Sequence, residues 1–153
     1  MAQITPRGGR ISGTSSIVQL DAWNWKDALI KENDGIHLNF PVTFSKSGSW
    51  FEPGTVEVNK EYQKQIEEIK AFFATSKAYN SDSSKERNLV FESMKGLFDG
   101  SQTLFIHSDS EKQIIDAIQF AKDNEIKRMV IVGGFEAYKS ADLLKKNNIS
   151  VLL

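Results

Sequence analysis

TLFIHS (103–108), KRMVIVGG (127–134) and SVLL (150–153) are the three runs that decide the fold of this chain. Each run is short and rich in apolar residues. The segments between them, 110–126 and 135–149, carry apolar residues at helical spacing. Apolar strands that alternate with amphipathic helices of this length are typical of parallel βαβ units. We therefore predict three parallel, adjacent strands joined by right-handed crossovers in the C-terminal third.

Composition indicates one soluble α/β domain or a large piece of one. The chain has 153 residues, of which 40% are hydrophobic, a net charge of −1 and a pI of about 6.1. Its charges are mixed, so we expect no nucleic-acid and no membrane partner. The absence of cysteine excludes disulfides, thiolate catalysis and cysteine metal ligands. No apolar stretch is long enough to span a bilayer, and no signal-peptide core is found.

The N-terminal segments are expected to be extended or irregular. Residues 6–16 hold three glycines and four hydroxyl residues, which predicts a loop that could include a short extended piece. Residues 16–23 alternate and predict a strand, and 35–41 predict a second one. Between them, 23–35 could carry a short helix, while the Gly- and Pro-marked stretch 42–55 is expected to be a polar loop.

Two helices are predicted next. Residues 58–80 show helical spacing with Asn59 as N-cap, and 81–100 form a second helix that begins near Ser83 or Ser84. Gly35 and Gly100 are expected to stop helices. The two long helices could form a partner-binding hairpin, but packing on the sheet explains their apolar faces more simply.

Two histidines are candidate functional residues. His107 lies near the carboxyl end of the predicted strand 103–108. Loops at that end form the ligand site in open α/β sheets and barrels. A structural role for His107 stays open on position alone. His37 lies among apolar residues and is expected to be a half-buried strand histidine that bonds to the backbone.

Two glycine-containing segments resemble anion sites only weakly. Gly133 and Gly134 follow a strand, yet the spaced glycines of a dinucleotide fingerprint and the Gly-Lys-Ser/Thr of a Walker loop are absent. We expect a compact strand-to-helix turn. Arg7 and Arg10 could hold an anion, but their segment lacks a clear strand before it and a clear helix after it.

Three carboxylates and two tryptophans have simple structural explanations. Asp109 and Glu111 are placed in the first turn of the helix after His107, and Glu136 in the matching place after Gly134, where negative charge favours a helix. Trp23 and Trp25 would face one side of an extended segment. A core or an interface explains them as well as a stacking platform does.

Residues 11–41 and 103–153, read together, resemble the middle of a bacterial metal-dependent amidohydrolase, in the branch related to imidazolonepropionase-like enzymes. The resemblance implies an α/β fold, namely a partial (β/α)8 (TIM-type) barrel with parallel strands and a helical insertion, truncated at both ends. It implies that 1–153 is a single fragment of the catalytic barrel. Within it, 1–57 would be loop-rich extended segments, 58–100 a helical pair and 101–153 a βαβαβ unit.

The resemblance also implies the chemistry of the parent protein. In that superfamily a bound divalent metal, zinc above all, lowers the pKa of water so that hydroxide attacks an amide or related C–N bond. His107 matches the metal-binding histidine at the end of the fifth barrel strand, so we treat it as a candidate ligand in the full-length parent. The parent would act on a small-molecule substrate.

Departures from the family pattern limit what this chain can do alone. The His-x-His pair of the first barrel strand is absent, and no segment supplies the Asp of the last strand. The strand after His107 carries Gly133 and Gly134 where many relatives have a histidine. We expect this chain to bind no catalytic metal and to hydrolyse nothing itself. The alternative is a free-standing βαβαβ small-molecule-binding module without catalysis, with its ligand at the Gly133–Gly134 turn.

A truncated barrel would leave uncovered sheet edges and apolar faces, so the isolated chain is expected to self-associate. Light scattering over a range of concentrations checks this expectation. A strict monomer at high concentration would favour the free-standing module.

Overall fold

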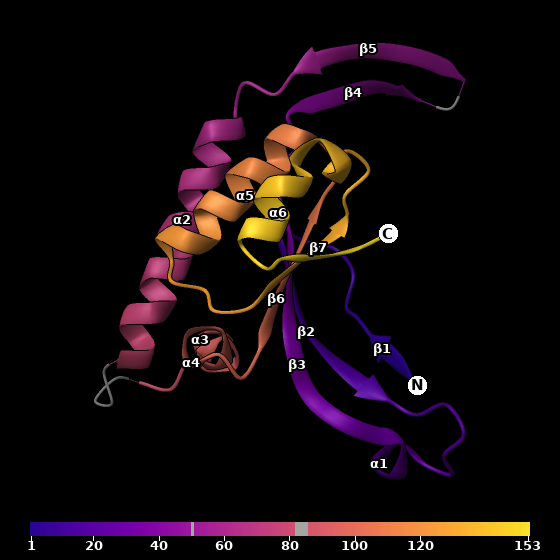
Figure 1. The fold of residues 1–153 in the computed structure, drawn as a ribbon, viewed down its shortest axis with the longest axis vertical. Helices are drawn as coiled ribbons and strands as arrows, with labels where there is room; N and C mark the ends of the chain where they lie inside the picture. Colours follow the sequence, from indigo (N-terminus) through magenta and orange to yellow (C-terminus); the bar gives the residue numbers. More distant parts are fainter. Residues whose placement is uncertain (50, 82–85) are drawn as a thin grey trace.

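The computed structural model describes residues 1–49, 51–81 and 86–153, which form a curled α/β structure (Figure 1). Its main sheet has six strands in the order β1-β2-β3-β6-β7-β8. Their bounds are Ala2–Ile4 for β1, Ile11–Val18 for β2, Leu29–Asn39 for β3, Thr103–Ser108 for β6, Met129–Gly133 for β7 and Ser150–Leu152 for β8.

The three C-terminal strands are parallel and adjacent, as predicted. β6 pairs with β7 and β7 with β8, both in parallel. β3 also joins β6 in parallel, with Gly35 opposite Thr103 and Asn39 opposite His107. The β1–β2 and β2–β3 pairs are antiparallel, so the sheet is mixed rather than parallel throughout.

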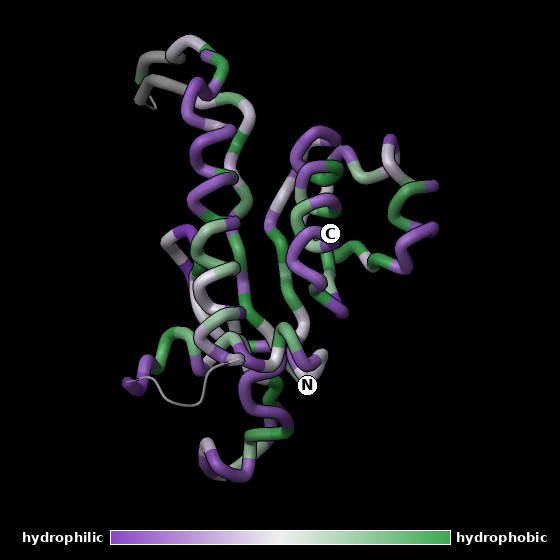
Figure 2. The backbone as a smooth tube through the Cα atoms, turned by 90° about the vertical axis from the view of Figure 1, so that its left-hand side faces the viewer, coloured by the Kyte–Doolittle hydropathy of each residue, from purple (hydrophilic) through white to green (hydrophobic). Residues whose placement is uncertain are grey.

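Helices cover one face of this sheet. They are α2 (Tyr62–Ser81), α3 (Leu89–Ser93), α4 (Lys95–Asp99), α5 (Glu111–Asp123) and α6 (Ala141–Lys146), with a 3-10 turn η1 (Ala137–Ser140) before α6. The single turn α1 (Trp25–Ala28) has no buried residues and lies apart from them, between β2 and β3 at their far end (Figure 1). In Figure 2 the hydrophobic colour follows the central strands, whereas α2 begins hydrophilic and becomes paler in its second half. None of the helices formed by the described residues is long and apolar enough to cross a membrane.

The core lies between the sheet and the helices α2 and α5. Ile36 and Ile106 point into it from the strands, and Phe73 and Phe120 meet there edge to face, with ring centroids 5.0 Å apart. The Tyr62 hydroxyl donates to Asp116 at 2.7 Å and ties the start of α2 to α5.

Two segments that were predicted to be loops contain strands instead. Residues 11–16 belong to β2 rather than to a loop, because Gly13, at a φ of +122°, and the adjoining register shift form an irregularity that the strand absorbs. The predicted loop 42–55 contains most of a hairpin of β4 (Phe44–Ser49) and β5 (Glu52–Val58). Pro53 lies opposite Gly48 beside a register shift, which is a place where a strand tolerates proline.

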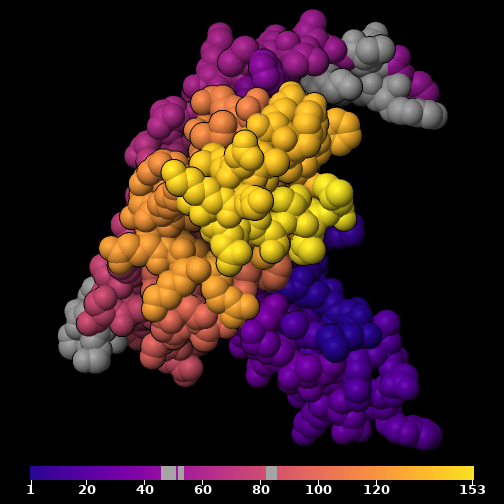
Figure 3. Space-filling view, viewed as in Figure 1, coloured from indigo at the N-terminus to yellow at the C-terminus, as the bar shows by residue number. Residues whose placement is uncertain are grey.

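The predicted helix in 23–35 is only the single turn α1, which the Asn24 side chain caps. Gly35 lies inside β3 and stops no helix. Trp23 is 99% exposed and Trp25 73%, so neither enters the core. Figure 3 shows this N-terminal part, in indigo and purple, as a lobe that projects away from the C-terminal body.

The helical region agrees with the sequence in part. The predicted helix 58–80 is α2, and the Asn59 side chain accepts the Glu61 N–H at its start. The predicted helix 81–100 is instead two short helices, α3 and α4, which meet at Met94. Asn88 caps α3, whereas Ser83 and Ser84 lie outside the described residues. Gly100 ends α4 at a φ of +90°, as predicted.

We predict that Phe73→Ala lowers the free energy of unfolding by about 3–5 kcal/mol, because it leaves a cavity under α2. Phe73 is fully buried against Phe120. Urea denaturation measures the change. The same truncation at Phe135, which is 83% exposed, is the control and should have little effect. Equal losses in the two variants would contradict the placement of this core.

Candidate functional site

The structure brings the chain's two histidines together. His37 on β3 and His107 on β6 lie on neighbouring parallel strands, near their carboxyl ends. The His37 Nδ1 atom is 2.9 Å from the His107 Nε2 atom, which is hydrogen-bond distance. His37 is 2% exposed, and His107 is half-buried.

Strand alternation places both rings on one face. Ile36 and Ile106 point into the helix-covered core, so His37 and His107 point to the opposite face of the sheet. In the register of β3 and β6, His37 is opposite Phe105, and His107 lies two residues further along β6, opposite Asn39. The two imidazoles are therefore diagonal neighbours.

The expectation for His37 was wrong in two respects. Its ring bonds to His107 rather than to the backbone, and it is buried rather than half-buried. The pairing of the two segments was missed because β3 and β6 are far apart in the sequence. One signal was present: GIHLNFP and TLFIHS both place a histidine near the end of an apolar run.

Phe105 holds the His37 ring in place. The two rings are stacked with centroids 4.7 Å apart and an interplanar angle of 7°. Gly35 makes room for this arrangement, since a Cβ there would lie 2.4 Å from the Phe105 ring and 2.4 Å from the Thr103 carbonyl oxygen. A glycine in the middle of β3 is thus explained by a close approach of side chain and backbone.

Burial sets the electrostatics of the pair. It lowers the pKa of His37 from its ordinary value of 6.5, and the adjacent His107 lowers this pKa further, against the opposing charge of Asp34. Burial also lowers the pKa of His107, against the opposing charge of Asp109. Both shifts favour the neutral rings at pH 7, and a hydrogen bond between two neutral rings requires that one of the two facing nitrogens donates and the other accepts.

Two polar atoms at this end of the sheet are buried without a hydrogen-bond partner in the described part of the chain. They are the His37 Nε2 atom and the Ser108 Oγ atom, which immediately follows His107 in sequence. Such orphaned atoms are uncommon in folded proteins and call for an explanation.

The other predicted site residues do not join the histidine pair. Gly133 and Gly134 adopt positive φ values of 91° and 63° in a tight turn, as expected. A Cβ on Gly133 would lie 2.5 Å from an Asp109 carboxylate oxygen, so this turn is filled by protein. Arg10 donates to the Asn39 carbonyl oxygen at 3.3 Å.

The carboxylates have structural roles, as expected, but Glu136 and Asp109 are placed differently from the prediction. Glu111 lies in the first turn of α5, and the Glu136 carboxylate accepts its N–H at 2.9 Å. Glu136 thus favours the N-terminus of α5 rather than that of its own segment. Asp109 precedes the Ser110 N-cap and lies outside the helix.

These side chains do not make a metal centre by themselves. Among the residues that the structure describes, no group of three or more His, Cys, Asp or Glu side chains could hold a metal ion. A hydrolytic zinc site ordinarily needs three protein ligands. The donor set therefore does not fit a complete catalytic metal site within these residues.

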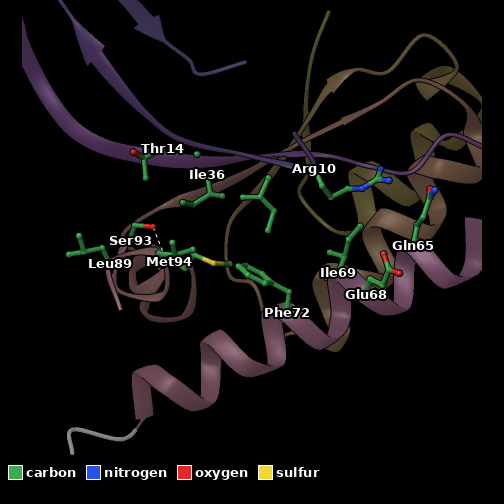
Figure 4. A pocket seen from close by; sticks show the side chains of 13 residues that line it. Arg10, Thr14, Ile36, Gln65, Glu68, Ile69, Phe72, Leu89, Ser93 and Met94 are labelled. Carbon is green, nitrogen blue, oxygen red and sulfur yellow. Dashed lines mark hydrogen bonds between the residues drawn. The ribbon is translucent and has the colours of Figure 1, made fainter. Parts of the chain in front are cut away.

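A separate cavity of about 740 Å³ lies on the helix-covered face, between β2, β3, α2 and α3 (Figure 4). Its walls are mostly apolar, with Arg10, Gln65 and Glu68 together at one end. Ile36 lines it, so it lies across the sheet from His37. The cavity and the histidine pair are two different places.

Comparisons with known proteins support the fold. A solved amidohydrolase from Thermotoga maritima superimposes with a TM-score of 0.74 at 17% sequence identity. The match covers 99% of this chain and 41% of that one, so this chain spans less than half of the neighbour's length. No family model matches the sequence, and no curated protein matches it. The fold is therefore similar to part of an amidohydrolase.

We predict that stability falls as pH drops below about 6.5, the value for unperturbed histidine. The pKa values of His37 and His107 are lowered in the folded chain. Below this pH the unfolded chain therefore binds more protons than the folded chain, which lowers the free energy of unfolding. The stability that the two neutral histidines contribute is fully present only above that pH. Urea unfolding between about pH 7.5 and about pH 5.5 measures the slope.

The matched control is the double variant His37→Asn with His107→Asn, which should lose most of this dependence. A double variant with an unchanged slope would assign the effect to other groups.

Proposed function

We propose that this chain forms part of the barrel of an amidohydrolase-type hydrolase that acts on amide or other C–N bonds. The observation that carries the proposal is the place of His107. It lies at the carboxyl end of a parallel strand and faces away from the helices, in a fold similar to part of an amidohydrolase. The finer assignment to a TIM-type barrel of the imidazolonepropionase-like branch belongs to this proposal and rests on the sequence resemblance.

The chain's own residues would supply part of the site. His107 is the proposed metal ligand, and a divalent metal such as zinc would supply an activated water when bound. Further ligands would come from other strands of the barrel, because no group of three or more His, Cys, Asp or Glu side chains among the described residues could hold a metal ion. We therefore propose that the chain is inactive by itself.

The non-catalytic binding module remains a second candidate because of one observation. The 740 Å³ cavity has the size and apolar walls of a small-molecule site. It does not lie at the Gly133–Gly134 turn, where this alternative placed the ligand. An amphipathic ligand with its charged end at Arg10 would suit the cavity.

Self-association of the isolated chain is part of the first proposal. β1 and β8 are the outer strands of the described sheet, and Phe135, Tyr138 and Leu153 are exposed near the β8 edge. Additional barrel strands would cover such an edge.

The reading frame around this segment provides the test. We expect an upstream His-x-His and a downstream strand with an aspartate in the same frame. The protein encoded by that frame should hold stoichiometric zinc by elemental analysis and hydrolyse at least one member of a panel of linear and cyclic amides. His107→Asn should lower kcat/KM at least a hundredfold, about 2.7 kcal/mol of transition-state stabilisation.

The 153-residue chain, dialysed against zinc and then against buffer, should retain no stoichiometric metal. Zinc that this short chain retains, and that His107→Ala removes, would contradict the proposal. A reading frame without the two flanking motifs would favour the binding module.

A further inference from the structure

The cavity on the helix-covered face combines an apolar wall with a polar end (Figure 4). The wall includes the buried side chains of Ile36 on β3, Ile69 on α2 and Met94, where α3 and α4 meet, with the ring of Phe72 beside them. A volume of about 740 Å³ and mostly apolar walls are ordinary for a site that holds a small organic molecule. In such sites the few polar groups determine which molecule binds.

Two opposite charges lie at the polar end without pairing. Arg10, just before β2, and Glu68, on α2, both line this end of the cavity (Figure 4). Among the described residues, neither side chain takes part in an ion pair. The Arg10 guanidinium makes a single hydrogen bond within this part of the chain, a long one of 3.3 Å from Nη1 to the Asn39 carbonyl oxygen. A cation and an anion therefore line the same space, and both can bind a ligand.

The Gln65 side chain adds a hydrogen-bond donor to this end. Its Oε1 atom accepts from the Asn59 Nδ2 atom at 3.3 Å, so its Nε2 atom is the remaining polar group of the amide. Within the described parts of the chain this nitrogen makes no hydrogen bond. The polar end thus presents donors from Arg10 and Gln65 and an acceptor from Glu68.

We propose that the cavity binds a zwitterionic amphipathic molecule, namely an α-amino acid with a large apolar side chain. Its carboxylate binds Arg10 and Gln65, its ammonium group binds Glu68, and its side chain lies against the apolar wall. A ligand with only one charge fits less well, because a carboxylate alone meets Glu68 and an amine alone meets Arg10. The proposal rests on the small-molecule site of the second candidate function and is independent of hydrolysis.

A protein helix is the other occupant that an apolar groove can take. A helix would bind through the apolar residues on one of its faces. That mode gives no role to a cation and an anion that lie unpaired at one end of the cavity. The two charges therefore favour the small zwitterion.

A matched series of probes tests the proposal on the 153-residue chain. Tryptophan, indole-3-propanoate, tryptamine and 3-methylindole share the indole ring and carry both charges, the carboxylate alone, the ammonium alone or no charge. NMR titration of ¹⁵N-labelled protein near neutral pH measures each affinity and locates the binding site. We expect tryptophan to bind at least about threefold more tightly than each other probe, since exposed charge pairs contribute modestly. The amide shifts should fall in 10–14, 65–72 and 89–94, which hold most of the lining residues.

Two substitutions of exposed residues assign the charges. Arg10→Gln should weaken the binding of tryptophan and strengthen that of tryptamine, because it removes an attraction for the carboxylate and a repulsion of the amine. Glu68→Gln should weaken tryptophan and strengthen indole-3-propanoate for the converse reason. Arg7→Gln and Glu67→Gln are the matched controls, since both residues are exposed and neither lines the cavity, and they should leave all four affinities unchanged.

Three results would overturn the proposal in different ways. Equal affinities for the four probes would show an apolar small-molecule site without a preference for a zwitterion. Shifts of the lining residues when the protein alone is concentrated would show that a second copy occupies the cavity. Shifts with none of the probes would remove the small-molecule site as well as its ligand. None of these results decides the hydrolase, which is tested by metal content and activity.

Discussion

The parallel pairing of β3 with β6 is the contact on which the rest of the structure depends. It joins the antiparallel N-terminal strands to the C-terminal βαβαβ unit across more than sixty residues of helices and hairpin. Gly35 opposite Thr103 permits it, because a side chain at that position would collide with the Phe105 ring and the Thr103 carbonyl. The same register aligns His37 with His107. One backbone pairing thus builds both the core and the candidate site.

This pairing also divides the sheet into two chemically different faces. At the paired ends of β3 and β6, Ile36, Leu38, Leu104 and Ile106 belong to the core under the helices. Odd-numbered residues carry the imidazoles and Phe105 on the other face. The Gln113 side chain donates to the Pro41 carbonyl at 2.8 Å and fixes the start of α5 against the end of β3. The helices therefore hold the strand ends in place without entering the histidine face.

The predictable part of this fold is the part with short-range periodicity. The order of strands and helices in 103–153 was predicted correctly, because the apolar pattern of each element is visible within about fifteen residues. The helix predicted over 135–149 is shorter, namely the 3-10 turn η1 followed by α6. The N-terminal half was harder. Gly13 and Pro53 are loop signals in sequence, yet each lies at an irregularity of a strand. Gly35 has the sequence context of a helix stop, and nothing local shows that the Phe105 ring will lie against it. His107 was found from its position at a strand end, whereas its contact with His37 depends on a non-local register.

The imidazole at position 37 is difficult to explain by stability alone. Its Nε2 atom is buried without a partner in the described residues, which costs about 1–3 kcal/mol in a protein interior. A leucine would pack against Phe105 without that penalty and without favouring the unfolded state at low pH. Positions where a residue departs from ordinary packing and hydrogen bonding, at a cost in stability, are often functional. His37 takes this place beside His107, with its Nδ1 atom 2.9 Å from the His107 Nε2 atom near the end of a parallel strand. The histidine pair is therefore better explained as a functional position on this face of the sheet than as part of the packing of the sheet.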